Sequence, residues 1–203
     1  MTIAATELTD EVEPIQPPEL GALERRHELG QFLTPEPVAD FMASLFETPW
    51  RELNLLDAGA GGGALSAALV RSLCTAARKP KAISITAYEI DSTMIEPLRV
   101  TMAGCQRDCA RAGIQFTATV LHEDFIQAAV PMVWQELFAP PAPSFDDAIV
   151  IPPYRQIRRG SPAGLALRST GRETSNDYLG FVALIVRLLG LGGGSVALPT
   201  GGV

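Results

Sequence analysis

The sequence lacks several features that would narrow its function at once. No apolar run reaches the roughly 18 residues that a membrane span requires. The first twenty residues contain no lysine or arginine of the kind that opens a signal peptide. The only histidines, His27 and His122, are isolated from other metal-ligating residues, and no Ser-His-Asp arrangement is legible. We therefore expect a cytoplasmic protein with no membrane segment and no metal site.

Cysteine is also scarce, with 3 residues in a chain of 203. Cys74, Cys105 and Cys109 are odd in number, and the Cys105-x-x-x-Cys109 spacing has no further Cys or His beside it to complete a metal site. We expect three reduced thiols.

Positive charge is in short supply over most of the chain. Five acidic residues in positions 1–20 account for most of the net charge of -7 and leave -2 for the rest. Positions 155–172 differ, because they carry five arginines and no acid. Such a stretch suits contact with nucleic-acid phosphates, although a solvated surface loop would have the same composition. The arginines are Arg155, Arg158, Arg159, Arg168 and Arg172.

The organisation of the chain indicates one α/β domain. Residues 1–19 are acidic and proline-rich and should form a flexible lead-in, whereas 20–203 have the length and the apolar content for a single core. After a short helix at 19–29 and a helix capped by Thr34 with Pro35 at its first position, strands and helices alternate. This alternation predicts a doubly wound, mostly parallel sheet. The expected strands are 53–57, 83–89, 114–121, 147–151 and 195–198, and the helices 63–78, 92–111, 125–138 and 176–189.

A glycine-rich loop follows the first expected strand and opens a helix. Its pattern is Asp57-x-Gly59-x-Gly61-x-Gly63, in which glycine permits a tight turn and a close approach of backbone to a ligand. The loop favours S-adenosylmethionine, but it also satisfies a dinucleotide-binding pattern, and a structural turn is a third possibility. Glu89, at the end of the second strand, would accept the ribose hydroxyls of either cofactor.

A second motif, Ile151-Pro152-Pro153-Tyr154, closes the fourth expected strand. Alone, a diproline is an ordinary strand terminator. Together with the glycine loop, it resembles the N6-adenine DNA methyltransferases of restriction-modification systems, whose tetrapeptide reads Asn or Asp, Pro, Pro, aromatic. The resemblance implies a Rossmann-like class I methyltransferase fold that uses S-adenosylmethionine.

The resemblance also implies roles for cofactor-binding residues outside the loop. The segment that ends in Thr34-Pro35 would close over the methionine end of the cofactor. Asp124 would accept a hydrogen bond from the adenine amine, and the backbone N–H of Phe125 would meet a ring nitrogen. A plain helix N-cap is the alternative for Asp124, and the two roles are compatible.

In such enzymes the tetrapeptide holds the target amine of a base flipped out of the duplex. By position, the carbonyl of Pro152 would accept one N–H and Tyr154 would stack on the base. Ile151 stands where the family has the second acceptor, so we expect a loss of activity of about 10²- to 10³-fold. Arg155, Arg158 and Arg159 would then contact DNA.

The resemblance also sets an expectation about what is missing. In enzymes with this motif order the DNA-reading domain follows the catalytic domain, and this chain stops just after its fifth strand. We expect a truncated catalytic domain without the final antiparallel hairpin. It would reach double-stranded DNA through a missing or separate recognition domain and would have a cognate restriction or specificity subunit as partner. The alternatives are a protein glutamine N5-methyltransferase, which shares the pocket, and a catalytically dead cofactor-binding remnant.

Overall fold

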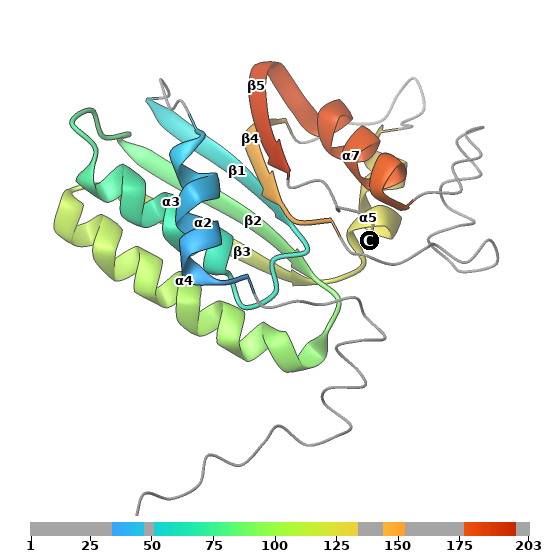
Figure 1. The fold of residues 1–203 in the computed structure, drawn as a ribbon, viewed down its shortest axis with the longest axis horizontal. Coiled ribbons are helices and arrows are strands. Elements are labelled where there is room, and N and C mark those ends of the chain that lie inside the picture. Colours follow the sequence, from blue (N-terminus) through green and yellow to red (C-terminus); the bar gives the residue numbers. More distant parts are fainter. Residues whose placement is uncertain (1–33, 47–50, 134–143, 153–176, 198–203) are drawn as a thin grey trace, which may run out of the picture.

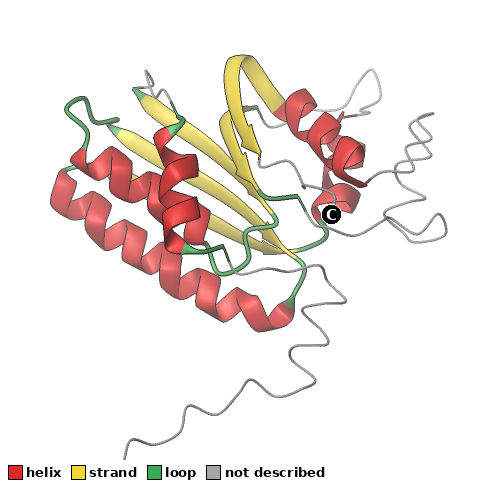
Figure 2. Ribbon diagram, in the orientation of Figure 1, coloured by secondary structure: helices red, strands yellow, loops and turns green. Residues whose placement is uncertain are grey.

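The centre of the molecule is a five-stranded parallel sheet (Figures 1 and 2). The computed structural model describes residues 34–46, 51–133, 144–152 and 177–197. The strands lie in the order β3-β2-β1-β4-β5, which confirms the predicted doubly wound class. Their bounds are β1 (Glu52–Ala58), β2 (Ala82–Glu89), β3 (Gln115–His122), β4 (Phe145–Val150) and β5 (Leu189–Ala197).

Helices cover both faces of the sheet (Figure 1). On one face lie α2 (Glu36–Ser44), α3 (Ala64–Thr75) and α4 (Ser92–Ala112), and on the other α5 (Phe125–Val133) and α7 (Asp177–Leu188). Successive strand residues alternate between two apolar cores, so that Leu55 belongs to the first core and Leu56 to the second. Burial on both faces explains the near-continuous apolar runs of β1 and β4.

The first helix departs from the sequence prediction. Thr34 is not its N-cap, because Pro35 holds that position without a side-chain cap, and the Pro35 carbonyl accepts the N–H groups of Val38 and Ala39. Val38, Phe41, Met42 and Leu45 recur at helical spacing, which predicts one apolar stripe facing the core, but only two of the four residues face it. Val38 is half-buried and Met42 is buried, but Phe41 and Leu45 are 57% and 50% exposed. The small residues Ala39 and Ala43 complete the buried face instead and allow α2 to pack closely on α3.

Helix ends differ from the prediction for local reasons. α3 stops at Thr75 rather than at 78 because Ala76 adopts an extended conformation. The described part of α5 reaches Val133, so its expected end at 138 lies outside the described residues, as does the expected helix at 19–29.

Two strand boundaries differ as well. β4 ends at Val150, so Ile151 lies one residue beyond it. β5 starts at Leu189, directly after α7, rather than at 195. The pairing of β4 with β5 shifts register between Phe145 and Asp147. At Gly190 a Cβ atom would lie 2.8 Å from the Ser144 hydroxyl oxygen, so glycine permits the strand to start there.

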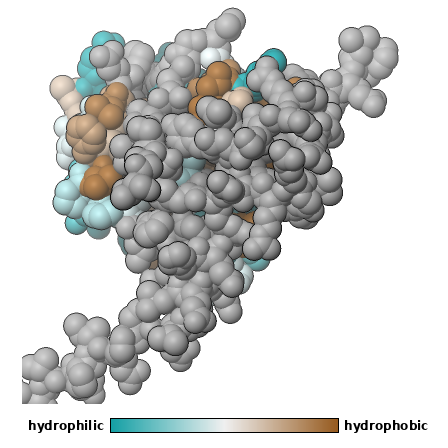
Figure 3. Space-filling view, turned by 45° about the vertical axis from the view of Figure 1, so that its right-hand side comes forward, coloured by the Kyte–Doolittle hydropathy of each residue, from teal (hydrophilic) through white to brown (hydrophobic). Residues whose placement is uncertain are grey.

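The surface of the described residues has no single large apolar face. Figure 3 shows the hydrophobic surface of the visible side divided into separate small patches. The exposed large hydrophobic side chains are spread over α2, α4, α7 and the end of β2. No described helix is long and apolar enough to cross a membrane. The cysteines are free thiols, and the described residues include no cluster of three or more metal-ligating side chains.

Candidate functional site

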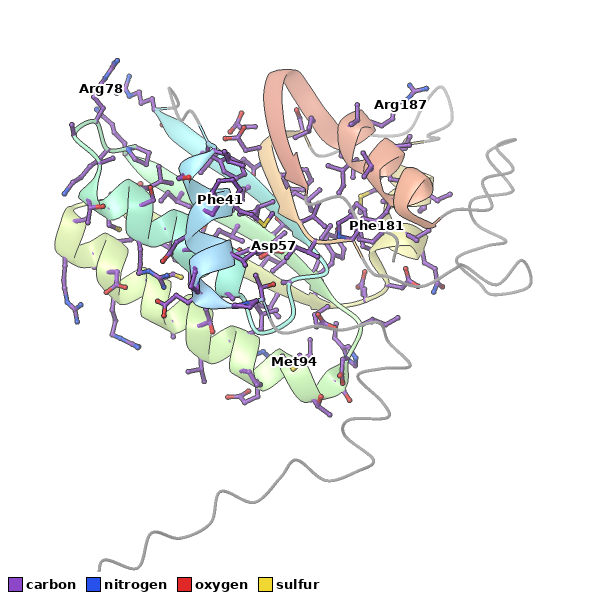
Figure 4. The ribbon with its side chains drawn as sticks, viewed as in Figure 1. Phe41, Asp57, Arg78, Met94, Phe181 and Arg187 are labelled. Carbon is purple, nitrogen blue, oxygen red and sulfur yellow. The ribbon has the colours of Figure 1, made fainter. Side chains whose placement is uncertain are left out.

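The glycine loop and the first residues of the second motif lie side by side at the carboxyl ends of two neighbouring strands. β1 and β4 are hydrogen-bonded neighbours, with Asp57 paired to Ile149. The glycine loop therefore leaves β1 beside the point where Ile151 and Pro152 leave β4. The chain crosses to opposite sides of the sheet after these two strands, and such a switch point is where open α/β sheets bind ligands. Figure 4 labels Asp57 together with Met94 of α4 and Phe181 of α7, which come from the two opposite faces.

The end of β2 holds the glycine loop in place. The carbonyl of Tyr88 accepts the N–H groups of Gly59 and Ala60 at 2.9 and 2.8 Å, and Glu89 Oε2 accepts that of Gly61 at 2.6 Å. The N–H of Gly63 donates to the Ala60 carbonyl at 2.8 Å. Four hydrogen bonds, three of them to the end of β2, thus hold the backbone of the loop in place.

The three motif glycines all have positive φ, at 88°, 54° and 83° for Gly59, Gly61 and Gly63. Their surroundings differ. A Cβ atom at Gly63 would lie 2.9 Å from Leu98 Cδ1, whereas one at Gly61 would meet no heavy atom within 4 Å. Gly63 therefore allows α4 to pack against the loop, and Gly61 faces open space.

Asp57 lies fully buried at the foot of this loop. Its Oδ2 accepts a hydrogen bond of 2.5 Å from the Ser66 hydroxyl, while Oδ1 has no hydrogen-bond partner among the described residues. Burial raises the pKa of Asp57 to about 7, against the lowering effect of Ser66, and the charge of Glu89 adds to the rise. A buried charged acceptor without a donor is costly, which agrees with the raised pKa of Asp57.

Glu89 is buried at the end of β2, as the sequence predicted for an acidic residue beside the loop. Its Oε1 accepts the N–H of Asp91 at 2.7 Å, and its Oε2 accepts that of Gly61. These bonds fix the orientation of the carboxylate.

Asp124 caps α5, which confirms the N-cap interpretation. Its Oδ1 accepts the N–H groups of Ile126 and Gln127 at 2.8 and 3.3 Å, and its backbone carbonyl accepts that of Ala128. Oδ2 accepts only from the Gln127 side chain, at 3.1 Å, among the bonds of the described residues.

An aromatic cluster lies next to the loop and was not predicted. The ring of Phe125 packs edge-on against Tyr88, with centroids 5.4 Å apart, and against Phe181 at 4.9 Å. Phe181 Cζ also lies 3.9 Å from a Cβ position at Gly59. The sequence analysis gave a role only to the backbone N–H of Phe125 and none to Tyr88 or Phe181. The position of Tyr88, one residue before Glu89 at a strand end, was the signal available.

Other predicted residues are placed as follows. Thr34 and Pro35 directly precede α2, which contacts α3 through Arg71. Ile151 is half-buried against the core beneath α2, α3 and α4, and Pro152 is buried. The remaining predicted catalytic and DNA-binding residues lie outside the described residues. These are Pro153, Tyr154, Arg155, Arg158 and Arg159.

Comparison with known proteins connects this site to methyltransferases. The chain is 36% identical over 173 residues to the Type II methyltransferase M.PstI of Providencia stuartii, and 36% over 174 residues to M.BsuBI of Bacillus subtilis. The matches cover 85% and 84% of this chain but 33% of each relative. The chain therefore spans about a third of the length of the curated relatives that it matches. No family model matches it.

Solved structures agree on the fold. A putative class I S-adenosylmethionine-dependent methyltransferase from Listeria monocytogenes superposes with a TM-score of 0.57 at 19% identity, covering 81% of this chain and 45% of that one. The methyltransferase subunit of a type I restriction-modification system from Streptococcus thermophilus gives 0.50 at 17% identity, covering 78% and 32%. The chain thus has the class I S-adenosylmethionine-dependent methyltransferase fold, and over most of its length its sequence is homologous to part of the Type II methyltransferases.

Proposed function

We propose that this chain forms the cofactor-binding and catalytic part of a restriction-modification methyltransferase that transfers a methyl group from S-adenosylmethionine to N6 of adenine in DNA. The observation that carries the proposal is the meeting of the glycine loop and the residues after β4 at one edge of the sheet. The homology to Type II methyltransferases supports it independently.

The charges around the loop favour S-adenosylmethionine over a dinucleotide. Asp57 and Glu89 interact electrostatically, and both lie at the loop. Carboxyl groups repel the pyrophosphate of a dinucleotide but attract the ammonium and sulfonium groups of S-adenosylmethionine. The open space at Gly61 leaves room for the ligand.

We assign the residues of this chain to parts of the cofactor by their acceptor atoms. Asp57 lies buried beneath the loop that would hold the cofactor. Glu89 would accept the ribose hydroxyls, and Asp124 Oδ2 the adenine amine beside the N–H of Phe125. Thr34 and Pro35 would cover the methionine end. When bound, S-adenosylmethionine supplies an electrophilic methyl group.

The residues after β4 would hold the acceptor amine. The lone pair of the adenine amine is delocalised into the ring, so hydrogen bonds from both of its N–H groups must favour a more tetrahedral nitrogen. The Pro152 carbonyl would accept one, and Tyr154 would stack on the flipped base. Ile151 has no acceptor for the second N–H, and its side chain joins the apolar core instead. We therefore propose that Ile151 lowers the activity of this chain.

The partner is double-stranded DNA, by the same proposal. Arg155, Arg158 and Arg159 would neutralise phosphates, and the DNA-reading function would come from a part of the protein that this chain does not include or from a separate subunit. The same proposal includes a cognate restriction enzyme as partner and a cytoplasmic location.

A chimaera tests this function. This chain would replace the matching segment of M.PstI, with position 151 as Ile, Asn or Val, and nucleosides of methylated DNA would be identified by mass spectrometry. We expect N6-methyladenine, formed about 10²- to 10³-fold faster with Ile151→Asn than with the natural residue.

The Ile151→Val variant is the matched control, since it changes the side chain without adding an acceptor, and we expect it to match the natural residue. Equal rates for Asn and Ile at position 151 would show that the residues after β4 have been misassigned. Methylation of cytosine alone would refute the adenine specificity.

A further inference from the structure

A threonine of α4, outside both motifs, forms a hydrogen bond with the glycine loop. The Oγ1 atom of Thr101 donates to the carbonyl oxygen of Gly62 at 2.7 Å, across 39 positions of sequence. The same atom lies 3.0 Å from the carbonyl of Pro97, one turn earlier in its own helix. We propose that Thr101 is a positioning residue that holds the cofactor loop in its binding conformation, an inference that rests on the proposed function.

The carbonyls of Gly62 and Pro97 compete for one hydroxyl hydrogen of Thr101, and the distances favour the carbonyl of Gly62 in the loop. A threonine hydroxyl carries one hydrogen, so it can make only one full-strength hydrogen bond. The contact with Gly62 is the shorter of the two. Bonding of a helical threonine to its own preceding turn occurs without any role in binding, whereas a bond to a loop carbonyl ties two distant segments together.

The position of Gly62 makes this bond important for the loop. Gly59, Ala60, Gly61 and Gly63 all donate their N–H groups to acceptors within the fold. Thr101 holds the loop by the carbonyl of Gly62, which lies between Gly61, facing open space, and Gly63, the N-cap of α3. Loss of the hydroxyl therefore frees the part of the loop nearest to the ligand.

Packing reinforces the bond from the same helix. Thr101 Cγ2 lies 3.0 Å from a Cβ position at Gly63, next to Leu98 Cδ1 at 2.9 Å and Met102 Cε at 3.3 Å, while Met94 Cε lies 3.5 Å from that of Gly62. Four side chains from three successive turns of α4 thus pack against the loop. Valine at position 101 would keep the methyl contact and remove the hydroxyl alone.

The test compares four proteins: wild type, Thr101→Val, Thr101→Ser, which keeps the hydroxyl, and Thr75→Val. Thr75 is the matched control because its hydroxyl bonds only to carbonyls of its own helix, those of Arg71 and Ser72. Calorimetric titration with S-adenosylmethionine gives the affinity. Hydrogen exchange of the backbone amides at 59–63 reports on the loop without cofactor.

We expect Thr101→Val to bind S-adenosylmethionine about 3- to 10-fold more weakly and to exchange its loop amides faster by a similar factor. Thr101→Ser and Thr75→Val should stay close to wild type in both measurements. If Thr101→Val matches wild type, or if Thr101→Ser is as impaired as Thr101→Val, the hydroxyl has no positioning role.

The two readouts separate this inference from the proposed function. Failure of the wild-type protein to bind S-adenosylmethionine would contradict the function, and the exchange rates would then decide the role of Thr101 by themselves. Should Thr101→Val not fold, Thr101→Ala replaces it, and the same exchange comparison with Thr101→Ser applies.

Discussion

At the scale of single residues, Asp57 is the most informative side chain. It is buried, one of its oxygens has no donor among the described residues, and burial raises its pKa to about 7. A carboxyl group in that state costs stability when it ionises. Such a cost at the foot of a loop is typical of a site shaped for a ligand rather than for stability.

The raised pKa predicts a specific pH dependence of stability. Because the folded state holds the Asp57 proton more tightly than the unfolded state, its contribution to the free energy of unfolding is complete below about pH 4 and is lost as the pH rises through about 7. Relative to Asp57→Asn, we expect the wild type to lose stability across this window, by at most about 1.4 kcal/mol per pH unit.

Urea unfolding at several pH values between 4 and 8 measures this difference, with Asp108→Asn as a control at a carboxyl group that is 43% exposed. Parallel stability profiles for wild type and Asp57→Asn would contradict the proposed state of Asp57.

Some residues of the site were predictable from sequence and others were not. Asp57, the three glycines and Glu89 were found because their spacing after two strands fixes their place at one edge. Thr101, Tyr88 and Phe181 were missed because their contacts with the loop depend on how α4 and α7 pack, which no local pattern specifies. Thr34 was wrongly taken as a cap because the following proline itself ends the extended segment.

At the scale of elements, the cap of α5 links folding to the proposed site. One carboxylate oxygen of Asp124 binds the first turn of the helix, and the other faces only the Gln127 side chain among the described residues. The helix start and the proposed contact with the cofactor's adenine therefore use different atoms of one side chain.

Substitutions at Asp124 should separate these two roles. Asp124→Ala removes the cap, and we expect a loss of about 1 kcal/mol in the free energy of unfolding together with weaker cofactor binding. Asp124→Asn keeps the capping oxygen and replaces the other with an N–H donor, so stability should hold while affinity for S-adenosylmethionine falls. Denaturation and calorimetry measure the two effects, and unchanged affinity in Asp124→Asn would leave this residue with the cap alone.

The elements show where sequence patterns are informative. The alternation of strands and helices gave the parallel sheet, because buried parallel strands read as continuous apolar runs. The start of β5 was missed, since a glycine-rich run is not typical of a strand, and only the close approach to Ser144 accounts for Gly190 there. On α2, alanine rather than Phe41 forms the buried face because the helix lies tight against α3.

At the scale of the whole molecule, the order of the strands in the sheet brings the two parts of the candidate site together. The sheet continues from β1 to β2 on one side and to β4 on the other, so the loop after β1 and the residues after β4 meet at the same edge although about ninety positions separate them. No pattern of neighbouring residues in the sequence predicts that these two segments lie side by side. It follows from the handedness of the connections between parallel strands, which the alternation of elements made predictable.

Titration of the wild-type protein with S-adenosylmethionine by calorimetry tests the central claim most directly. The account predicts saturable binding of one molecule per chain, with NAD giving no heat of binding under the same conditions. Absence of binding to S-adenosylmethionine by a folded protein, or tighter binding of NAD, would contradict it.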